Sequence, residues 1–222
     1  MSQVRRVFLF LMAAVLVLGL TRSWAEERDR SRGRPGVFDY YLLSLSWSPE
    51  YCAGPAGEND QRQCHQGRRY GFVVHGLWPE YEKGYPQFCA GSSRVSARLV
   101  EQMLPIMPSE KLIRHEWRKH GTCTGLTAEQ YFDKTATAFA RVTIPMRYKN
   151  PPTAITITPR RLKQDLVAAN PQFTEEGVAV LCRGRFLSEV RVCLDKDLQP
   201  RSCSADVRDA CRPEKIILRP VR

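Results

Sequence analysis

The sequence lacks most of the features that mark a metal-binding, membrane-spanning or multidomain protein. No two of its eight cysteines form a Cys-x-x-Cys pair, so a zinc or redox interpretation of the cysteines is weak. After residue 25 no apolar stretch could span a membrane, and no internal repeat, low-complexity tract or interdomain linker is present. Acceptor sites of the Asn-x-Ser/Thr type are also absent, which slightly favours a bacterial source. These absences predict one soluble domain.

The first 25 residues have the three-part layout of a secretory signal peptide. Arg5 and Arg6 precede an apolar run over residues 7–20, and Ser23 and Ala25 are the small residues of a cleavage site. The apolar run is shorter than the roughly 20 residues that a spanning helix needs, so a membrane anchor is the weaker alternative. We therefore expect cleavage after Ala25.

Cleavage at this point defines the expected organisation of the chain. It gives a signal peptide over residues 1–25, a flexible leader over residues 26–37, which is charged and contains Gly and Pro, and one domain over residues 38–222. We expect the mature protein to be a monomer that is exported to a periplasm or to the medium and is not bound to a membrane.

Basic residues outnumber acidic ones, with 34 Lys and Arg against 23 Asp and Glu. Loss of the signal peptide removes Arg5, Arg6 and Arg22 and no acid, which lowers the net charge from +11 to +8. This balance fits a polyanionic partner such as nucleic acid, although membranes and glycans also bind cationic secreted proteins. The even number of cysteines in an exported chain indicates four disulfides, whose pairing stays open at this point.

Strand-like segments lie at both ends of the domain, and helix-like segments lie between them. The strand candidates are residues 38–47, 70–77, 178–182, 186–194 and 215–219, and we expect Trp78-Pro79 to end the second. The helix candidates are two stretches within residues 97–119, divided around Pro105 and Pro108, with Ser109 capping the second, then residues 127–142 and a stretch from Thr158 to about Asn170. This order predicts an α+β domain built around an antiparallel sheet.

Residues 115–120, HEWRKH, gather two of the chain's four histidines around a glutamate and a lysine. On a helix, His115, Glu116, Lys119 and His120 fall at roughly 0°, 100°, 40° and 140°, all on one side. That face combines two imidazoles, a carboxylate and an ammonium group, which suits anion binding and proton transfer.

Two other interpretations of this face are weaker. A zinc protease motif needs histidines four residues apart beside a glutamate, whereas Lys119 occupies that place after His115 and would repel a metal. A merely solvated face would pair Glu116 with His120, which leaves His115 and Lys119 unexplained.

His75 is a further candidate, at the end of the strand candidate 70–77. A lone strand histidine is more often structural, but the second histidine cluster in the same domain favours a catalytic role. RNA carries its own nucleophile, the 2′-hydroxyl, and two histidines can take its proton and protonate the departing 5′-oxygen without a metal. A basic, exported protein without a metal motif fits that reaction.

The segments FVVHGLWPE (72–80) and HEWRKHGTC (115–123) resemble the two active-site segments of the ribonuclease T2 family of secreted endoribonucleases. Each segment is specific, and the two occur in the expected order and spacing. The likeness extends more weakly to SLSWSPEYC (44–52), to Cys89 and to the four C-terminal cysteines, so it covers most of the domain. It implies a curved antiparallel sheet with helices packed on it, single-stranded RNA as the substrate, and no cofactor.

The resemblance also assigns roles residue by residue. His75 matches the general acid for the leaving 5′-oxygen, His120 the general base for the 2′-hydroxyl, and His115 a phosphate-binding histidine. Glu116 and Lys119 match the pair that polarises the phosphate and stabilises the pentavalent transition state. The implied product is a 2′,3′-cyclic phosphate, which is hydrolysed more slowly to a 3′-phosphate after the two histidines exchange roles.

Base binding and disulfide pairing follow from the same resemblance. Trp78 matches an aromatic that stacks on unpaired bases, Glu80 stands where many members have aspartate, and Tyr85 is a candidate by position. The pairing in other members implies Cys52–Cys64, Cys89–Cys123, Cys182–Cys211 and Cys193–Cys203.

Two other classes of protein remain as alternatives. The first is a cationic secreted toxin or binding module without turnover, against which the filled catalytic positions argue. The second is a metal-dependent phosphoesterase, which would need several carboxylates near the histidines in sequence.

Overall fold

The computed structural model describes residues 33–65, 67 and 69–221. The expected signal peptide and most of the expected leader lie outside these residues. At the end of the expected leader, the Gly36 N–H donates a hydrogen bond to the Cys123 carbonyl at 2.9 Å. In the part of the chain that the structure describes, no helix is long and apolar enough to cross a membrane.

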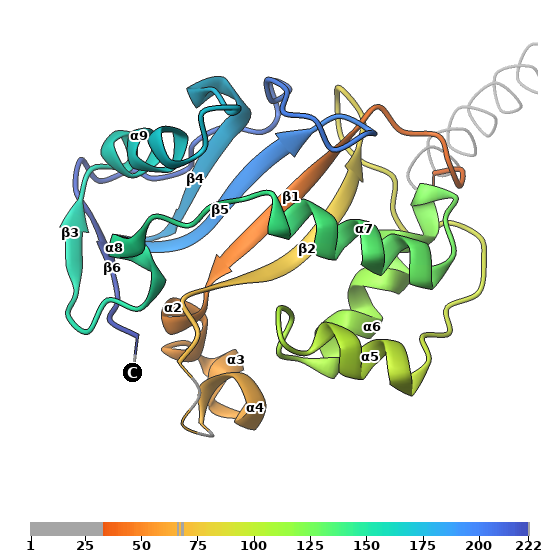
Figure 1. Ribbon diagram of the computed structural model, residues 1–222, viewed down its shortest axis with the longest axis horizontal. Helices are drawn as coiled ribbons and strands as arrows, with labels where there is room; N and C mark the ends of the chain where they lie inside the picture. The colour runs from red at the N-terminus through yellow and green to blue at the C-terminus, as the bar shows by residue number, and fades with distance from the viewer. Residues whose placement is uncertain (1–32, 66, 68, 222) are drawn as a thin grey trace, which may run out of the picture.

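A six-stranded sheet in the order β2-β1-β5-β6-β3, with β4 also paired to β5, runs through the molecule (Figure 1). Its strands are β1 (Tyr40–Trp47), β2 (Phe72–Glu80), β3 (Ile155–Ile157), β4 (Val178–Arg183), β5 (Phe186–Leu194) and β6 (Ile216–Leu218). The α+β class is therefore confirmed. Short β3 was missed, because three residues carry little periodicity.

One pairing differs from a purely antiparallel sheet, since β5 and β6 pair in parallel. A parallel pair needs a long connection, and the segment after β5 supplies it over residues 195–215. Two disulfides attach this long connection to the strands, through Cys203 and Cys211.

The helices fill the middle of the chain, as expected from the sequence. They are α2 (Ser48–Cys52), α3 (Pro55–Glu58), α4 (Gln61–Cys64), α5 (Ala97–Met103), α6 (Glu110–Lys119), α7 (Ala128–Ala140), α8 (Met146–Lys149) and α9 (Pro159–Ala169), with short 3₁₀ turns η1 (Gly121–Thr124) and η2 (Glu175–Gly177). Ser109, Thr127 and Thr158 cap α6, α7 and α9 through their hydroxyl oxygens. The helices absent from the sequence prediction are those of four or five residues.

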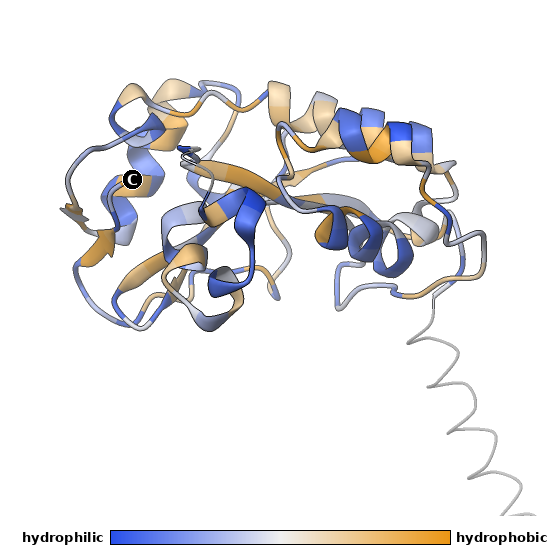
Figure 2. Ribbon diagram, turned by 90° about the horizontal axis from the view of Figure 1, so that it is seen from below, coloured by the Kyte–Doolittle hydropathy of each residue, from blue (hydrophilic) through white to orange (hydrophobic). Residues whose placement is uncertain are grey.

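The two faces of the sheet pack differently. Leu43, Leu45 and Val190 belong to the main hydrophobic core, which the helices complete, while Leu42 and Cys193 belong to a smaller cluster on the other face. Figure 1 shows α7 lying across β1 and β2, with α5 and α6 beyond the β2 edge. In Figure 2 the central strands are largely orange, the colour of hydrophobic residues, and the blue residues lie mostly on helices and loops.

Strand β2 continues through Pro79 to Glu80, so the expectation that Trp78-Pro79 ends it was wrong. The reason is its place in the sheet. β2 is an edge strand that pairs only with β1, and proline is tolerated at an edge because its missing N–H removes no bond from a second neighbour.

A β-bulge interrupts β2 at His75. Ser44 of β1 pairs with Gly76 and Leu45 pairs with Val74, so His75 has no partner on β1. The extra residue shifts the alternation of side chains along the strand. Val74 and Leu77 therefore both lie in the main core although they are three residues apart.

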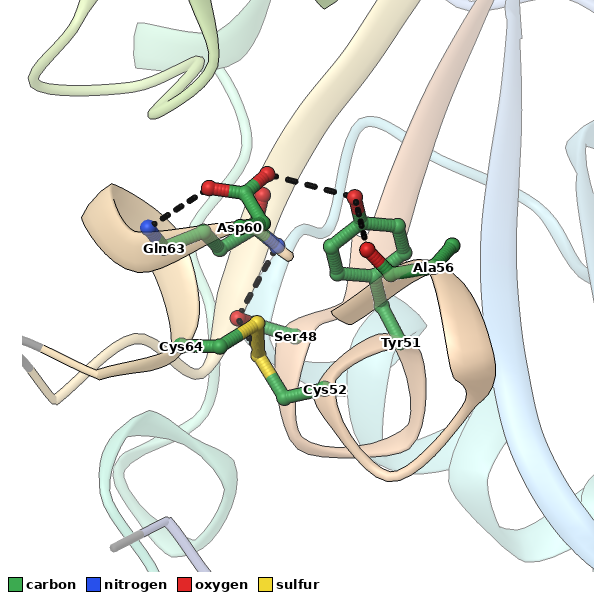
Figure 3. The surroundings of a disulfide bond; sticks show 7 residues. All are labelled: Ser48, Tyr51, Cys52, Ala56, Asp60, Gln63 and Cys64. Atoms are coloured by element: carbon green, nitrogen blue, oxygen red, sulfur yellow. Dashed lines mark hydrogen bonds between the residues drawn. A yellow bond between two sulfur atoms is a disulfide. The ribbon is translucent and has the colours of Figure 1, made fainter. Parts of the chain in front are cut away.

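Four disulfides join the eight cysteines, and their pairs are those that the resemblance implies: Cys52–Cys64, Cys89–Cys123, Cys182–Cys211 and Cys193–Cys203. Figure 3 shows the first of them, which connects α2 to α4. Around this bridge, Asp60 accepts hydrogen bonds from the Gln63 N–H and the Tyr51 hydroxyl, and the Gln63 amide donates to Ser48 (Figure 3). This hydrogen-bonded unit contributes no residue to the cavity described next.

Candidate active site

A cavity of about 430 Å³ lies where β2, β5 and the end of α6 meet. It is lined by Leu42, His75, Trp78, Glu80, Gly84, Tyr85, His115, Glu116, Lys119, His120, Arg191, Asp206 and Val207. All eight residues selected from the sequence as catalytic or base-binding candidates are among them. His65 follows α4 and is not part of this lining.

The bulge in β2 places its three candidate side chains on one face. His75, Trp78 and Glu80 all line the cavity, although regular alternation would direct His75 and Trp78 to opposite faces. The sequence spacing alone therefore does not predict that these two side chains meet.

Helix α6 supplies the other half of the site. It ends at Lys119, and His120 is its C-cap with φ −114°, still in the right-handed helical region, so that His120 lines the cavity together with His115, Glu116 and Lys119. The opposite side of α6 carries Ile113 and Trp117, which are buried in the main core and fix the helix against the sheet.

Glu116 and Trp78 join the two halves. The Trp78 Nε1–H donates to Glu116 Oε2 at 2.6 Å, and Glu116 is only 1% exposed. Gly76 lies beneath this bond, because a Cβ at that position would clash with both Glu116 Oε2 and Trp78 Nε1. The Trp78 ring also stacks on His120, with centroids 5.1 Å apart, and meets His75 edge-on at 5.1 Å.

His75 lies between two carboxylates. Its Nδ1 is 2.6 Å from Glu189 Oε1, and its Nε2 is 3.8 Å from Glu116 Oε1. Burial lowers the pKa of His75, but the hydrogen bond to Glu189 and the charge of Glu116 outweigh burial and raise the pKa overall. The same contact helps to lower the pKa of Glu189 to about 2, against the opposing effect of burial.

His120 has the opposite environment. It is 3% exposed, and its Nδ1 is buried without a hydrogen-bond partner among the described residues. Burial, together with the nearby Lys119 ammonium, lowers the pKa of His120 to about 2, so the imidazole is neutral at any ordinary pH. The pKa of His115 is also lowered, by burial and by Lys119.

Two buried carboxyl groups hold their protons into the neutral range. Burial raises the pKa of Glu116 to about 7, although His75 and the Trp78 hydrogen bond oppose the change. Burial likewise raises the pKa of Glu80 to about 8, against the effect of Arg191. At the mouth, Tyr85 is 44% exposed, and its ring lies 5.8 Å from the Lys119 Nζ.

The contribution of β5 to the site was not predicted from the sequence. Glu189 and Arg191 alternate with the core residues Val190 and Val192, so their charges stand on the cavity side of an otherwise apolar strand. That alternation is visible in the sequence, but it does not reveal that the strand lies near His75. Among the described residues, no group of three His, Cys, Asp or Glu side chains could hold a metal ion.

Comparisons with known proteins identify relatives of this chain. The model of the ribonuclease T2 family matches residues 38–203. A ribonuclease of Aeromonas hydrophila is 33% identical over 94% of this chain and 98% of its own length, and ribonuclease DdI of Dictyostelium discoideum is 32% identical over 91% and 97%.

Solved structures share the fold. An RNase-related protein from Calystegia sepium superposes with a TM-score of 0.68 at 22% identity, covering 83% of this chain and 98% of that one. A mutant of ribonuclease MC1 in complex with 5′-UMP gives 0.63 at 21% identity, covering 81% and 97%. Together with the family match over most of the domain, these similarities show that the chain belongs to the ribonuclease T2 family of RNA-cleaving endoribonucleases.

Proposed function

We propose that this endoribonuclease cleaves single-stranded RNA by transphosphorylation, with His120 as the general base and His75 as the general acid, and without a metal. The observation that supports this division is the contrast between the two imidazoles. His75 has a carboxylate on its Nδ1, which favours the protonated form. The Nδ1 of His120 is buried and has no partner among the residues that the structure describes, which favours the neutral form. An acid and a base are thereby distinguished before substrate binds.

The proposed reaction has two steps. In the first, His120 takes the proton of the 2′-hydroxyl, the 2′-oxygen bonds to phosphorus, and the 5′-oxygen leaves with a proton from His75. In the second, His75, now neutral, takes a proton from water, and the hydroxide opens the 2′,3′-cyclic phosphate while His120 protonates the departing 2′-oxygen. The product is a 3′-phosphate, and both histidines return to their starting states.

The remaining residues of α6 act on the phosphate. Lys119 supplies a positive charge, and His115 binds the phosphate oxygens at the mouth of the cavity. Glu116, with a pKa near 7, carries a proton in mildly acidic solution and can donate it in a hydrogen bond to a phosphate oxygen. Trp78 holds Glu116 in place through its indole N–H.

Base binding is assigned to Trp78, Tyr85 and Glu80, which all line the cavity. Tyr85 offers an exposed ring for stacking, and a protonated Glu80 can both donate and accept hydrogen bonds at a base edge. The solved relative with bound 5′-UMP supports nucleotide binding in this fold. Export through a cleaved signal peptide fits the four disulfides, which persist in oxidising compartments.

Substrate chemistry tests the proposal directly. The protein should bind single-stranded RNA and DNA with comparable, salt-sensitive affinity, because phosphate contacts dominate, and should cut only RNA, in the presence of chelator. Gel analysis of matched RNA, DNA and fully 2′-O-methylated RNA oligonucleotides measures this. Cleavage of either substrate without a free 2′-hydroxyl would refute the mechanism, and activity that returns only with added metal would support a metal-dependent phosphoesterase instead.

The Cys89–Cys123 disulfide should support activity as well as stability. It attaches the loop between β2 and α5 to η1, which follows α6. In the same loop the Phe88 N–H donates to the Lys119 carbonyl at the end of α6, at 2.8 Å. The double replacement Cys89→Ala/Cys123→Ala should lower the free energy of unfolding by about 3–4 kcal/mol and also lower kcat, because Lys119 and His120 lose their support.

The matched control is Cys52→Ala/Cys64→Ala, since that bridge lies in the α2–α4 unit outside the cavity. It should cost about 3 kcal/mol of stability and leave the kcat of the folded enzyme unchanged. Denaturant unfolding and single-turnover kinetics below the unfolding transition separate the two effects. Equal kcat in both double variants would contradict the role assigned to Cys89–Cys123.

A further inference from the structure

The contact between His75 and Glu189 spans three strands. His75 is on β2 and Glu189 is on β5, and β1 runs between these two strands. Neighbouring strands are about 4.8 Å apart, so the two side chains must reach across β1 over roughly 10 Å of backbone. They meet at 2.6 Å because the β1 residues paired with Glu189 and Arg191 are Ser46 and Ser44, whose side chains are short.

The two oxygens of Glu189 have separate partners. Oε1 faces His75 Nδ1, while Oε2 accepts from Arg191 Nε at 3.1 Å and from Arg191 Nη2 at 2.9 Å. Arg191 also lies over the Trp78 ring, with its guanidinium carbon 5.0 Å from the ring centroid. The ion pair between Glu189 and Arg191 uses only Oε2 and does not require the His75 imidazole. The contact of His75 with Oε1 is therefore independent of that ion pair.

On the basis of the function proposed for His75, we propose that Glu189 is the positioning residue of the general acid. Arg191 holds the Glu189 carboxylate in the orientation in which its Oε1 faces His75 Nδ1. The Nδ1–H of His75 donates to Glu189, which fixes the ring and leaves Nε2 as the nitrogen that protonates the 5′-oxygen. Glu189 does not touch the substrate and takes part in no bond-breaking step.

The charges around His75 determine what Glu189 contributes. Glu116 and His115 face it from α6, His120 follows that helix, and Glu189 and Arg191 face it from β5. Glu116 carries a proton below about pH 7, so in mildly acidic solution Glu189 is the ionised carboxylate that favours the imidazolium. Removing the charge of Glu189 should therefore lower the pKa of His75.

The experiment uses Glu189→Gln, which keeps the size and an acceptor oxygen but removes the charge. In NMR titrations of the folded protein, the His75 ring should titrate at lower pH than in the wild type. The alkaline limb of kcat/KM should move to lower pH by the same amount, and kcat on RNA above that limb should fall roughly 10- to 100-fold. Glu189→Asp, which keeps the charge, should lower the pKa of His75 less than Glu189→Gln does.

Two controls make the result specific. Glu101→Gln removes the same charge from an exposed site on α5 and should change neither the titration of His75 nor the pH profile. The leaving group of a substrate with an aryl group at the 5′-position needs little protonation. On this substrate the kcat of Glu189→Gln should be close to that of the wild type.

The outcomes distinguish this proposal from the function on which it rests. The NMR titration needs no turnover, so an unchanged His75 pKa in Glu189→Gln overturns the positioning role even if the enzyme is active. A rate loss that is equal on RNA and on the aryl substrate would also overturn it, because that pattern means general distortion. Absence of RNA cleavage by the wild type would instead reject the proposed function and leave the titration interpretable.

Discussion

Replacing His120 with alanine should abolish most RNA cleavage, with kcat reduced roughly 10²–10⁴-fold, and replacing His75 should have an effect of the same order. Each variant removes one of the two proposed proton-transfer groups from the cavity. Initial rates on a dinucleotide substrate measure the loss. His65→Ala is the matched control, because His65 lies outside the cavity lining, and it should retain full activity.

The pH profile and a leaving-group test assign the two roles. The rate should be bell-shaped, because His120 must be neutral and His75 charged. Because the pKa of His75 is raised, the rate should begin to fall only at a pH above the ordinary imidazole range. Because the pKa of His120 is lowered, the acidic limb of the profile should lie below that range.

A substrate with a very good leaving group at the 5′-oxygen should partly rescue His75→Ala and leave His120→Ala inactive. His115→Ala should lower kcat less than His75→Ala or His120→Ala does, and it should also raise KM, since His115 is proposed to bind the phosphate. Rescue of His120→Ala alone, or equal rescue of both variants, would reverse or reject the assignment.

Gly76→Ala should lower kcat by about 10²-fold although it adds only a methyl group. The added Cβ would occupy the space of the bond between Trp78 Nε1 and Glu116 Oε2, so both side chains must move. Glu116 would then be displaced from the phosphate, and Trp78 from its stacking on His120. Kinetics on RNA combined with thermal unfolding would show a loss of rate in an enzyme that is still folded.

Two further variants separate the possible causes. Gly184→Ala places the same change in the open β4–β5 turn, at φ +59°, so it should cost stability through backbone strain and leave kcat unchanged. Trp78→Phe removes the N–H donor without a clash, so it should lose part of the activity that Gly76→Ala loses. Wild-type activity in Gly76→Ala would show that the Trp78–Glu116 bond is not needed.

The sequence predicted the parts of the fold that have strong local signals. The long strands β1, β2 and β5 have buried, apolar patterns, and α6, α7 and α9 begin at residues whose hydroxyls cap them. Helices of four or five residues carry too little periodicity to be found in this way, and so does β3, whereas the equally short β6 was found because all three of its residues are apolar. The end of β2 was misplaced because edge position, not local preference, decides whether proline can be tolerated.

The site shows the same division between local and long-range information. His115, Glu116 and Lys119 were found because helical spacing brings them to one side. Glu189 was not found, because its contact with His75 depends on strand order and on small residues in β1. The different protonation of the two histidines likewise comes from burial and partners, which one-dimensional spacing does not contain.

The bulge in β2 leaves one residue of the strand outside the pairing of the sheet. Without residue 75, Val74, Gly76, Leu77 and Trp78 would alternate regularly against β1, and the present pairs Leu45–Val74, Ser44–Gly76 and Leu43–Leu77 would follow one another without interruption. His75 is thus the one residue of β2 that the pairing with β1 does not use. The pairing of the sheet therefore does not depend on which residue stands at position 75, and a histidine there is required only by the proposed chemistry.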